Sequence, residues 1–446
     1  MLKRLVVEKL FGTFDYSINL KPEGLTILTG PNGYGKTTIL RILEEFTNKN
    51  FIYFLGLHFK KIELLYDDFE AIITKNENSD ICLQVGDQKT TVKAERIYKR
   101  IMELLPFRKL ENDIWVNQNH SRTNTRDVLR ELAWLFQSER REQHFYARPS
   151  RRRLSKRVSF VFQEFLDFLD DTKLSKVLHI ETLRLLRRIQ NDGEDEGRRY
   201  SRGLIRQTYY EEIIDDYAER LMGIMSDVDA QYAAKSRELD SSYPSRLLNS
   251  SDTLSEADFR LRFSKIKETQ KLLANYGLSI KQADISPDHL SPRFDSSNAK
   301  ALSVYLSDVE TKLQVFEQLL NALNLFSESL NSRRFVNKRI VISKDFGLKF
   351  ITNDDIRLAL TELSSGEQHQ VVLFFDLLFC TDSSTLILID EPEMSLHIAW
   401  QHDFLAELRK IIAIRKAIAI VSTHSPQIIG NEWSSVYDLY DLEKGK

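Results

Sequence analysis

The stretch Gly24-Leu25-Thr26-Ile27-Leu28-Thr29-Gly30-Pro31-Asn32-Gly33-Tyr34-Gly35-Lys36-Thr37 decides the fold. Its first six residues have the apolar and β-branched character of a short buried strand. The turn that follows fits the pattern G-x-x-x-x-G-K-[ST] over residues 30–37, and residues 38–43 continue as an apolar-periodic helix. A strand, a glycine-rich loop and a helix in this order predict an α/β fold with a phosphate-binding loop.

The residue types in this loop suit nucleotide binding. Glycines let the backbone curl so that successive N–H groups face phosphate oxygens, and the helix N-terminus adds the positive end of a dipole. We expect Lys36 to reach the β- and γ-phosphates and Thr37 to place its hydroxyl on Mg²⁺, which takes few protein ligands. The predicted nucleotide-binding residues of the loop are Asn32, Gly33, Gly35, Lys36, Thr37 and Thr38.

A second buried strand is predicted at residues 385–389, a continuous aliphatic run that ends in Asp390-Glu391. Such a run is typical of a parallel strand that delivers acidic groups to a nucleotide site. We expect Asp390 to belong to the Mg²⁺ shell and Glu391 to act as a general base on the attacking water. The alternative is an acidic pair that begins a helix after a core strand.

Two further motifs lie near this strand in the sequence. Residues 363–368, Leu-Ser-Ser-Gly-Glu-Gln, open an apolar helix, so the serines and backbone N–H groups could cap that helix or bind an anion. Residues 417–421 predict another buried strand, which ends in Ser422-Thr423-His424-Ser425-Pro426. His424 stands where a γ-phosphate sensor would lie, although a histidine after a strand can also be purely structural.

Taken together, the four motifs resemble those of ABC-type ATPase heads of the SMC, RecF and OLD-like branch. The matching segments are GPNGYGKT (30–37), LSSGEQ (363–368), LILIDEPE (386–393) and STHSP (422–426). The resemblance implies a split P-loop ATPase head with a mixed sheet, made of residues 1–95 and 336–446 around an insertion at 96–335. It also implies that ATP and Mg²⁺ are bound.

In that family two heads sandwich ATP, so the resemblance implies a head-to-head dimer in which the phosphate loop of one copy faces Ser364 and Gly366 of another. Glu391 then resembles the catalytic glutamate and His424 the switch histidine. Residues 395–397, Ser-Leu-His, match a family segment that runs along the dimer interface.

Two positions of the family pattern are harder to place. Gln118, after the strand-like residues 114–116, is the candidate for the glutamine that senses Mg²⁺. Phe11 and Phe14 are the candidates for the aromatic side chain that stacks on adenine.

The middle of the chain reads as helical, with a possible seam along one helix. Apolar residues at alternating steps of four and three, an a/d pattern, are Leu302, Leu306, Val309, Leu313, Phe316, Leu320 and Leu323. Two interpretations stay open: an ordinary amphipathic helix, or a short antiparallel coiled coil with an upstream helix such as 259–276. A helix of thirty residues reaches about 45 Å, so no long SMC-type arm is expected.

The formal net charge of −2 hides an uneven distribution. Residues 93–206 contain 26 Lys and Arg against 17 Asp and Glu, a net charge of +9, which leaves −11 for the rest. One basic group lies within Arg140–Arg157, with Phe145 and Tyr146 among its arginines, and another lies within Arg184–Arg206. These arginines could contact nucleic acid, pair with an acidic partner such as a phage protein, or solvate helix faces.

Composition excludes other classes of protein. A chain of 446 residues that is 42% hydrophobic can fill several cores and does not read as disordered. Cys82 and Cys380 cannot build a disulfide framework or a zinc ribbon, which favours a cytoplasmic setting. Charged residues interrupt the longest apolar runs, and the N-terminus does not read as a secretory signal, so no membrane span is expected.

The predicted function follows from what accompanies the ATPase motifs. Residues 95–335 show no nuclease constellation, and the 22 residues after His424 are too few for a TOPRIM domain. The layout resembles stand-alone ATPases of bacterial anti-phage systems such as PARIS and Septu, which implies a dimer or hexamer that regulates a separate TOPRIM or HNH nuclease. The alternatives are a RecF/SMC-like repair ATPase that clamps DNA through Arg140–Arg157, and a scaffold that never turns ATP over.

Overall fold

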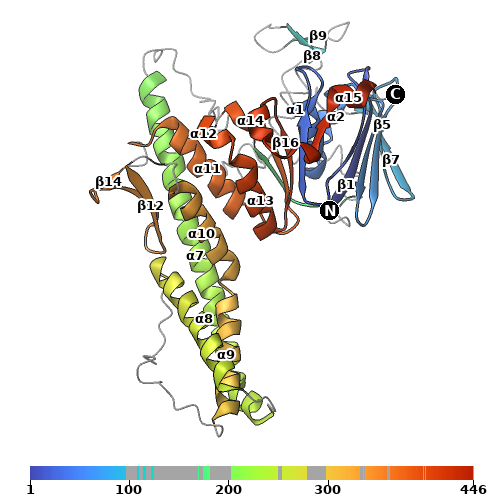
Figure 1. Cartoon of the computed structure of the whole chain (residues 1–446). Coiled ribbons are helices and arrows are strands. Elements are labelled where there is room, and N and C mark those ends of the chain that lie inside the picture. The colour runs from blue at the N-terminus through green and yellow to red at the C-terminus, as the bar shows by residue number, and fades with distance from the viewer. Residues whose placement is uncertain are drawn as a thin grey trace. The chain divides into compact units, whose positions relative to one another are not determined.

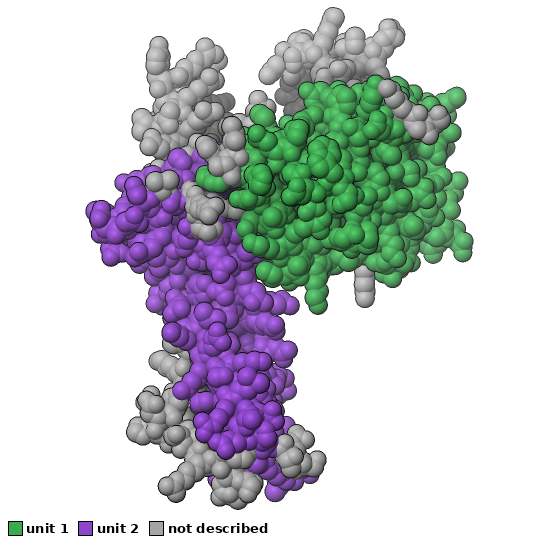
Figure 2. Space-filling model, in the orientation of Figure 1, with its two compact units in different colours: residues 1–184, 381–446 green, residues 185–380 purple. Residues whose placement is uncertain are grey.

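The structure is a computed structural model with two compact units, each described by itself (Figures 1 and 2). Unit 1 comprises residues 1–184 and 381–446, and unit 2 comprises residues 185–380. None of the helices in the described part of the chain is long and apolar enough to cross a membrane. The residues that the structure describes are 1–96, 108–109, 114–116, 122–124, 169, 174–180, 202–249, 254–278, 298–331, 335, 337–358, 362–394, 396 and 398–444.

A five-stranded parallel sheet forms the centre of unit 1, with the strand order β11-β15-β16-β3-β17. Its strands are β3 (Leu25–Thr29), β11 (Val177–Ile180), β15 (Leu386–Asp390), β16 (Ile418–Ser422) and β17 (Val436–Asp438). Strand β15 is buried along its whole length, as expected for a parallel strand covered on both faces. Because all five strands run the same way, their carboxyl ends meet at one edge of the sheet.

Unit 1 also contains a six-stranded antiparallel sheet, with the order β2-β1-β4-β5-β6-β7. Its strands are β1 (Leu2–Leu10), β2 (Phe14–Asn19), β4 (Lys61–Tyr66), β5 (Glu70–Lys75), β6 (Ile81–Val85) and β7 (Gln88–Val92). Strand β1 alternates buried Leu5 and Val7 with more exposed neighbours, so one face of this sheet is turned to the core.

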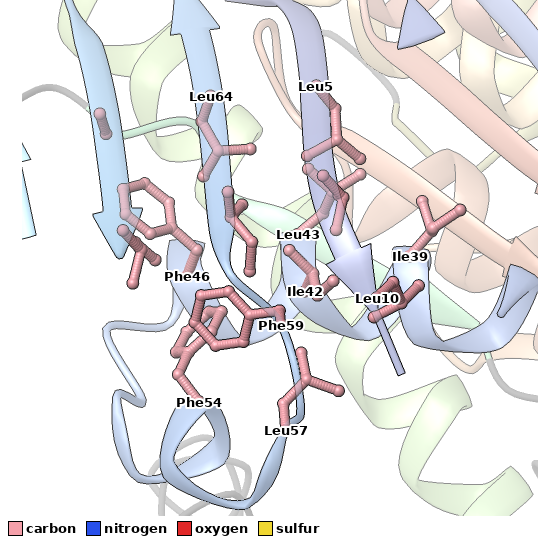
Figure 3. Packing of buried hydrophobic residues seen from close by; sticks show 14 of the residues in the cluster. Leu5, Leu10, Ile39, Ile42, Leu43, Phe46, Phe54, Leu57, Phe59 and Leu64 are labelled. Atoms are coloured by element: carbon pink, nitrogen blue, oxygen red, sulfur yellow. The ribbon is translucent and has the colours of Figure 1, made fainter. Parts of the chain in front are cut away.

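Helix α1 (Lys36–Thr47) follows the phosphate loop and packs its apolar face into this core (Figure 3). Ile39, Ile42, Leu43 and Phe46 recur at the helical period and are all buried. Figure 3 shows them beside Leu5, Leu10 and Leu64 of β1 and β4 and beside the aromatic side chains after the helix. The packing of α1 therefore fixes the position of Lys36, its first residue.

Short elements connect and flank the two sheets. They are α2 (Ile52–Gly56), β8 (Arg108–Lys109), β9 (Ile114–Val116), β10 (Arg122–Asn124), η3 (Pro392–Met394), α12 (Ile398–Gln401), α13 (Phe404–Arg415), α14 (Pro426–Ile429), η4 (Trp433–Ser435) and α15 (Leu439–Lys444). Strands β8, β9 and β10 form a small antiparallel sheet in which Ile114–Val116 is the middle strand, as its strand-like sequence predicts.

Unit 2 is built around α7 (Arg202–Asn249), a helix of 48 residues with Pro244 near its end. Figure 1 shows α8 (Glu256–Asn275) and α9 (Ala299–Gln314) alongside it, and α9 packs against both. At about 1.5 Å per residue α7 spans roughly 72 Å, longer than the expected 45 Å. The sequence did not reveal this length because the apolar positions of α7 follow no clear stripe.

The predicted apolar seam is divided between two helices. Helix α9 ends at Gln314 and α10 (Glu317–Asn331) begins after a break that contains the seam residue Phe316, so α10 carries only Leu320 and Leu323 of the seam. Leu306, Val309 and Leu313 are buried in α9, where ion pairs from Arg246 to Asp308 and from Arg262 to Glu310 join it to α7 and α8. The coiled-coil interpretation stays a prediction.

The rest of unit 2 is a small sheet and one buried helix. Strands β12 (Lys338–Ser343), β13 (Gly347–Thr352) and β14 (Arg357–Leu358) are antiparallel, and α11 (Ser365–Phe379) packs against α10 and α7. At the end of α11, burial raises the pKa of the Cys380 thiol to about 12, with Asp376 and Arg220 beside it.

This architecture confirms the predicted α/β class with a helical insertion. Parallel and antiparallel strands do not mix within one sheet of the described residues: the five-stranded sheet is parallel, and the other three sheets are antiparallel. Strand β11 lies inside the stretch predicted as insertion, yet it pairs with β15 in the parallel sheet. The boundaries predicted at residues 95 and 335 follow the positions of motifs, whereas the compact units end at residues 184 and 380.

Candidate nucleotide-binding site

The phosphate loop leaves the carboxyl end of β3 and curls back into α1. Gly35 precedes the helix with φ +87°, a left-handed conformation that favours glycine, and a Cβ there would lie 2.9 Å from Cδ2 of Leu10. The N-cap residue of α1 is Gly35, which has no side chain to accept a hydrogen bond from the first N–H groups of the helix, so these groups can bind an anion. The predicted loop residues Asn32 and Gly33 are exposed, and Thr38 is half-buried in the first turn.

Lys36 lies inside the loop that it is predicted to serve. It is 6% exposed, and its Nζ donates hydrogen bonds to the carbonyl oxygens of Gly30 at 2.8 Å and Pro31 at 3.3 Å. Burial lowers the pKa of Lys36, while the carboxylates of Glu391, Asp390, Glu393 and Asp438 act in the opposite direction. The cation therefore sits between the loop and a group of acids.

Thr37 and Asp390 meet at the edge of the parallel sheet. The Thr37 hydroxyl donates to Oδ1 of Asp390 at 3.3 Å, although 353 positions separate them in the sequence. The Ser422 hydroxyl donates to the same carboxylate oxygen, because Asp390 and Ser422 are register partners at the ends of β15 and β16. Ser422 was not predicted as a site residue, and its place as the first residue of the motif at 422–426 was the available signal.

Glu391 has a strained backbone. Its φ of 45° lies in the left-handed region, which costs about 1–3 kcal/mol for a residue other than glycine. Its N–H donates to the Ser422 carbonyl oxygen at 3.0 Å, which holds the residue in this conformation. The Glu391 side chain is 31% exposed, and its Oε1 lies 3.9 Å from Nε2 of His424. The structure thus brings the predicted base and the predicted phosphate sensor together.

These residues fit a magnesium nucleotide. Among the residues that the structure describes, no cluster of three or more His, Cys, Asp or Glu could hold a metal by itself. Mg²⁺ prefers one or two protein oxygens plus waters and phosphate oxygens, and Thr37 and Asp390 supply such a pair. Bound Mg²⁺ would neutralise phosphate charge, and the loop N–H groups and Lys36 would orient the phosphates.

An aromatic group borders the loop. The Phe14 ring lies 5.0 Å from the Tyr34 ring, Tyr34 lies 5.8 Å from Tyr440, and the Tyr16 hydroxyl donates to the Tyr34 carbonyl oxygen at 2.8 Å. Phe11 packs near Gly35. Phe11 and Phe14 therefore both lie at the loop, and their assignment to adenine stays a prediction. Tyr34 and Tyr440 were not singled out in the sequence.

The residues that resemble the family signature lie in unit 2. Ser364 is exposed and caps α11 through a capping box in which its backbone N–H and hydroxyl donate to Glu367, whose own N–H donates to the Ser364 hydroxyl. Nζ of Lys338 lies 2.9 Å from the same Glu367 carboxylate. Gly366 is half-buried in the first turn. This arrangement realises the capping interpretation, and the role of both residues toward a second copy stays a prediction.

Several predicted positions lie outside the described residues. They are Gln118, Ser395, His397 and the basic segment Arg140–Arg157. The second basic group, 184–206, falls mostly outside them as well.

A phosphate loop on a parallel sheet, with a hydroxyl and a carboxylate converging beside a buried lysine, defines a P-loop nucleotide-binding ATPase domain. The sequence matches the family described as AAA ATPase domain over residues 9–429, and the chain belongs to that family. The predicted fold class, an ABC-type P-loop ATPase head with a helical insertion, is confirmed.

Curated relatives match shorter segments. The retron Ec83 probable ATPase of Escherichia coli is 24% identical over 204 residues, 39% of this chain and 37% of that protein. Protein ea59 of Escherichia phage lambda is 37% identical over 78 residues, 17% of this chain and 14% of that protein. The chain thus spans well under half the length of these relatives.

Solved structures similar to the chain include SMC head domains. The head from Pyrococcus furiosus, solved with an extended coiled coil and the C-terminal domain of ScpA, has a TM-score of 0.36 and 11% identity over 98% of this chain and 92% of that one. The Thermotoga maritima SMC head has a TM-score of 0.34 and 10% identity over 98% of this chain and 94% of that one.

Proposed function

We propose that this protein binds and hydrolyses ATP at the loop after β3. The observation that carries the proposal is the meeting of Thr37 with Asp390 at 3.3 Å, beside the buried Lys36. These three side chains combine a hydroxyl and a carboxylate for Mg²⁺ with a cation for phosphate, which is the set that phosphoryl transfer needs. Glu391 stands next to them with the exposure that a base for an attacking water requires.

Two substitutions test this function. Lys36→Ala removes charge-assisted hydrogen bonds worth about 1.5–3 kcal/mol, so the ATP dissociation constant should rise about 10- to 150-fold. Glu391→Gln keeps the side-chain shape and removes the base, so binding should persist while turnover falls about 10²- to 10⁴-fold. Equilibrium binding of a fluorescent ATP analogue and phosphate release would be measured for both. Unchanged values in both variants would refute the assignment.

Exposed residues supply matched controls. Lys89→Ala on β7 and Glu77→Gln between β5 and β6 remove the same charges far along the chain from the predicted site residues. Both should leave ATP binding and turnover unchanged. If the controls reduce turnover as much as the site variants do, the loss reflects folding or net charge rather than the proposed chemistry.

We further propose that ATP joins two copies of the chain. In the proposed sandwich, Ser364 and Gly366 of one copy complete the phosphate site of another, as the family resemblance implies. Release of the Ser364 hydroxyl from Glu367 would free it for a phosphate oxygen. Sedimentation of Glu391→Gln with and without ATP tests this step, and the sandwich predicts an ATP-dependent shift to a dimer or larger assembly that Ser364→Arg abolishes.

The biological role that we propose is regulation of a separate effector, such as a nuclease, in defence against phage. One curated relative is named as a retron ATPase and another is a protein of phage lambda, which supports a setting of phage and host. Co-purification of the chain with the product of a neighbouring TOPRIM or HNH gene tests the role. DNA-stimulated ATPase activity that weakens steeply with salt and requires Arg140–Arg157 would instead support a DNA clamp.

A further inference from the structure

Two segments lie side by side at the carboxyl edge of the parallel sheet, one after β15 and one after β16. Asp390 and Ser422 are paired across the two strands, and the Glu391 N–H donates to the Ser422 carbonyl oxygen at 3.0 Å. The next residue of the second segment, Thr423, donates its N–H to the carbonyl oxygen of Leu28 on β3 at 3.1 Å. We call residues 422–425 the histidine segment and residues 390–393 the acidic segment. The histidine segment therefore runs between the acidic segment and β3, the strand that precedes the phosphate loop.

Glu393 binds this histidine segment from the acidic side. Its two carboxylate oxygens lie 2.9 and 2.8 Å from the Thr423 hydroxyl, and its Oε1 accepts the His424 N–H at 2.8 Å. The Thr423 hydroxyl in turn accepts the Ser425 N–H at 3.0 Å. The Glu393 carboxylate thus binds Thr423 and His424 directly and Ser425 through Thr423, the three residues that follow β16.

Glu393 is itself held in place. The buried Gln401 donates from Nε2 to the Glu393 carbonyl oxygen at 3.2 Å and to the Leu396 carbonyl oxygen at 3.1 Å, and its Oε1 lies 3.4 Å from the Ser425 hydroxyl. Gln401 therefore contacts both the acidic segment, at Glu393, and the histidine segment, at Ser425. A carboxylate fixed at both its backbone and its oxygens is suited to positioning, because little freedom remains for it to lose.

From this geometry we infer that Glu393 is a positioning residue for ATP hydrolysis, which holds the His424 imidazole beside the Glu391 carboxylate. The inference rests on the proposed hydrolytic function. Glu393 does not act as the base, since hydrogen bonds from Thr423 and His424 already occupy its oxygens. Glu391, which is 31% exposed, keeps that role, and Glu393 acts on it through the 3.9 Å contact with His424.

The test compares turnover and binding in the full chain. Glu393→Ala should lower kcat about 10- to 100-fold, the cost of misplacing a reacting group by about 1 Å, and should leave the ATP dissociation constant unchanged. Glu393→Gln should retain most of the turnover, because its amide oxygen still accepts the His424 N–H and its amide nitrogen can donate to Thr423. A purely structural role would not separate kcat from binding in this way.

A double-mutant cycle shows whether Glu393 acts through the histidine. If it does, Glu393→Ala combined with His424→Ala should turn over no more slowly than His424→Ala alone. Should Glu393→Ala fail to fold, Thr423→Val takes its place and should lower kcat, while Thr423→Ser should not. Glu77→Ala, at an exposed turn, serves as the control for loss of a glutamate.

The outcomes separate this inference from the function on which it rests. Turnover that depends on Glu391 and is the same in Glu393→Ala and the wild type overturns the inference alone. Additive losses in the double variant, or a loss of ATP affinity in proportion to kcat, also overturn it. A wild-type chain that binds ATP and never releases phosphate overturns the hydrolytic function and the inference together.

Discussion

A buried pair between β11 and α1 allows a prediction of stability with a defined magnitude. Nδ1 of His179 lies 2.6 Å from Oε2 of Glu44, and the two side chains are 1% and 4% exposed. Because a carboxylate only accepts hydrogen bonds, Nδ1 is the donor. Glu44 lies on the helix that follows the phosphate loop, and His179 lies on the edge strand of the parallel sheet, so the pair joins two elements of the nucleotide-binding unit.

Removing one member of this pair should be costly. His179→Leu keeps most of the ring volume and removes one hydrogen bond to a buried carboxylate, a loss of about 1.5–3 kcal/mol. For a domain of 150–250 residues each kcal/mol lowers the thermal midpoint by about 2–4 °C, so a fall of roughly 3–12 °C is expected. Replacing both residues by Leu should recover part of the loss, because the buried charge of Glu44 is then removed together with its histidine partner.

Circular dichroism melts without nucleotide are the appropriate assay, since a bound ligand would shift the midpoint by mass action. His179→Asn is the matched control, because its amide N–H can still donate to Glu44 and should restore part of the midpoint. A midpoint for His179→Leu within 2 °C of the wild type would refute the reasoning, and so would a double Leu variant that is less stable than either single one.

Two further predictions concern Gly35 of the phosphate loop and Cys380. Gly35→Ala should weaken ATP binding by roughly 5- to 150-fold, because a Cβ at φ +87° and 2.9 Å from Leu10 adds about 1–3 kcal/mol of strain to the loop. Titration with an ATP analogue measures the dissociation constant. Gly86→Ala, whose added Cβ meets no atom within 4 Å, is the control. Cys380 should resist iodoacetamide in the native protein at pH 8, because burial raises the pKa of its thiol to about 12 and leaves it protonated, and should react after unfolding. Peptide mass spectrometry reads the modification, and native labelling of Cys380 at the unfolded rate would contradict the burial.

The parts of the site that the sequence predicted are those that one segment encodes by itself. A strand, a glycine-rich turn and a helix are local, so the placement of Lys36 and Thr37 could be predicted from residues 24–43. The aliphatic runs that became β15 and β16 were equally clear, since parallel strands buried on both faces lack alternation. Asp390 and His424 followed from the ends of those runs.

The parts that could not be predicted depend on which segments lie next to each other. Strand β11 is only four residues long and belongs to the parallel sheet because it pairs with β15, a contact across 209 positions that no periodicity in the sequence indicates. The roles of Ser422 and Glu393 likewise depend on the strand order, which places β16 between β3 and β15. Glu393 lies two positions after the acidic pair, and its role can be assigned only once the fold places Thr423 beside it.

This strand order has a mechanical consequence for the site. Asp390 and Glu391 are hydrogen-bonded to Ser422. Glu393 is hydrogen-bonded to Thr423 and His424, and Thr423 is also hydrogen-bonded to Leu28 of β3, directly before the phosphate loop. A displacement of Ser422 should also shift Asp390 and Glu391, because each of these two residues shares a hydrogen bond with Ser422. In the proposed mechanism, loss of a γ-phosphate contact at His424 should therefore also shift Asp390 and Glu391, so that hydrolysis would be coupled to opening of the nucleotide site through Ser422, Thr423 and His424.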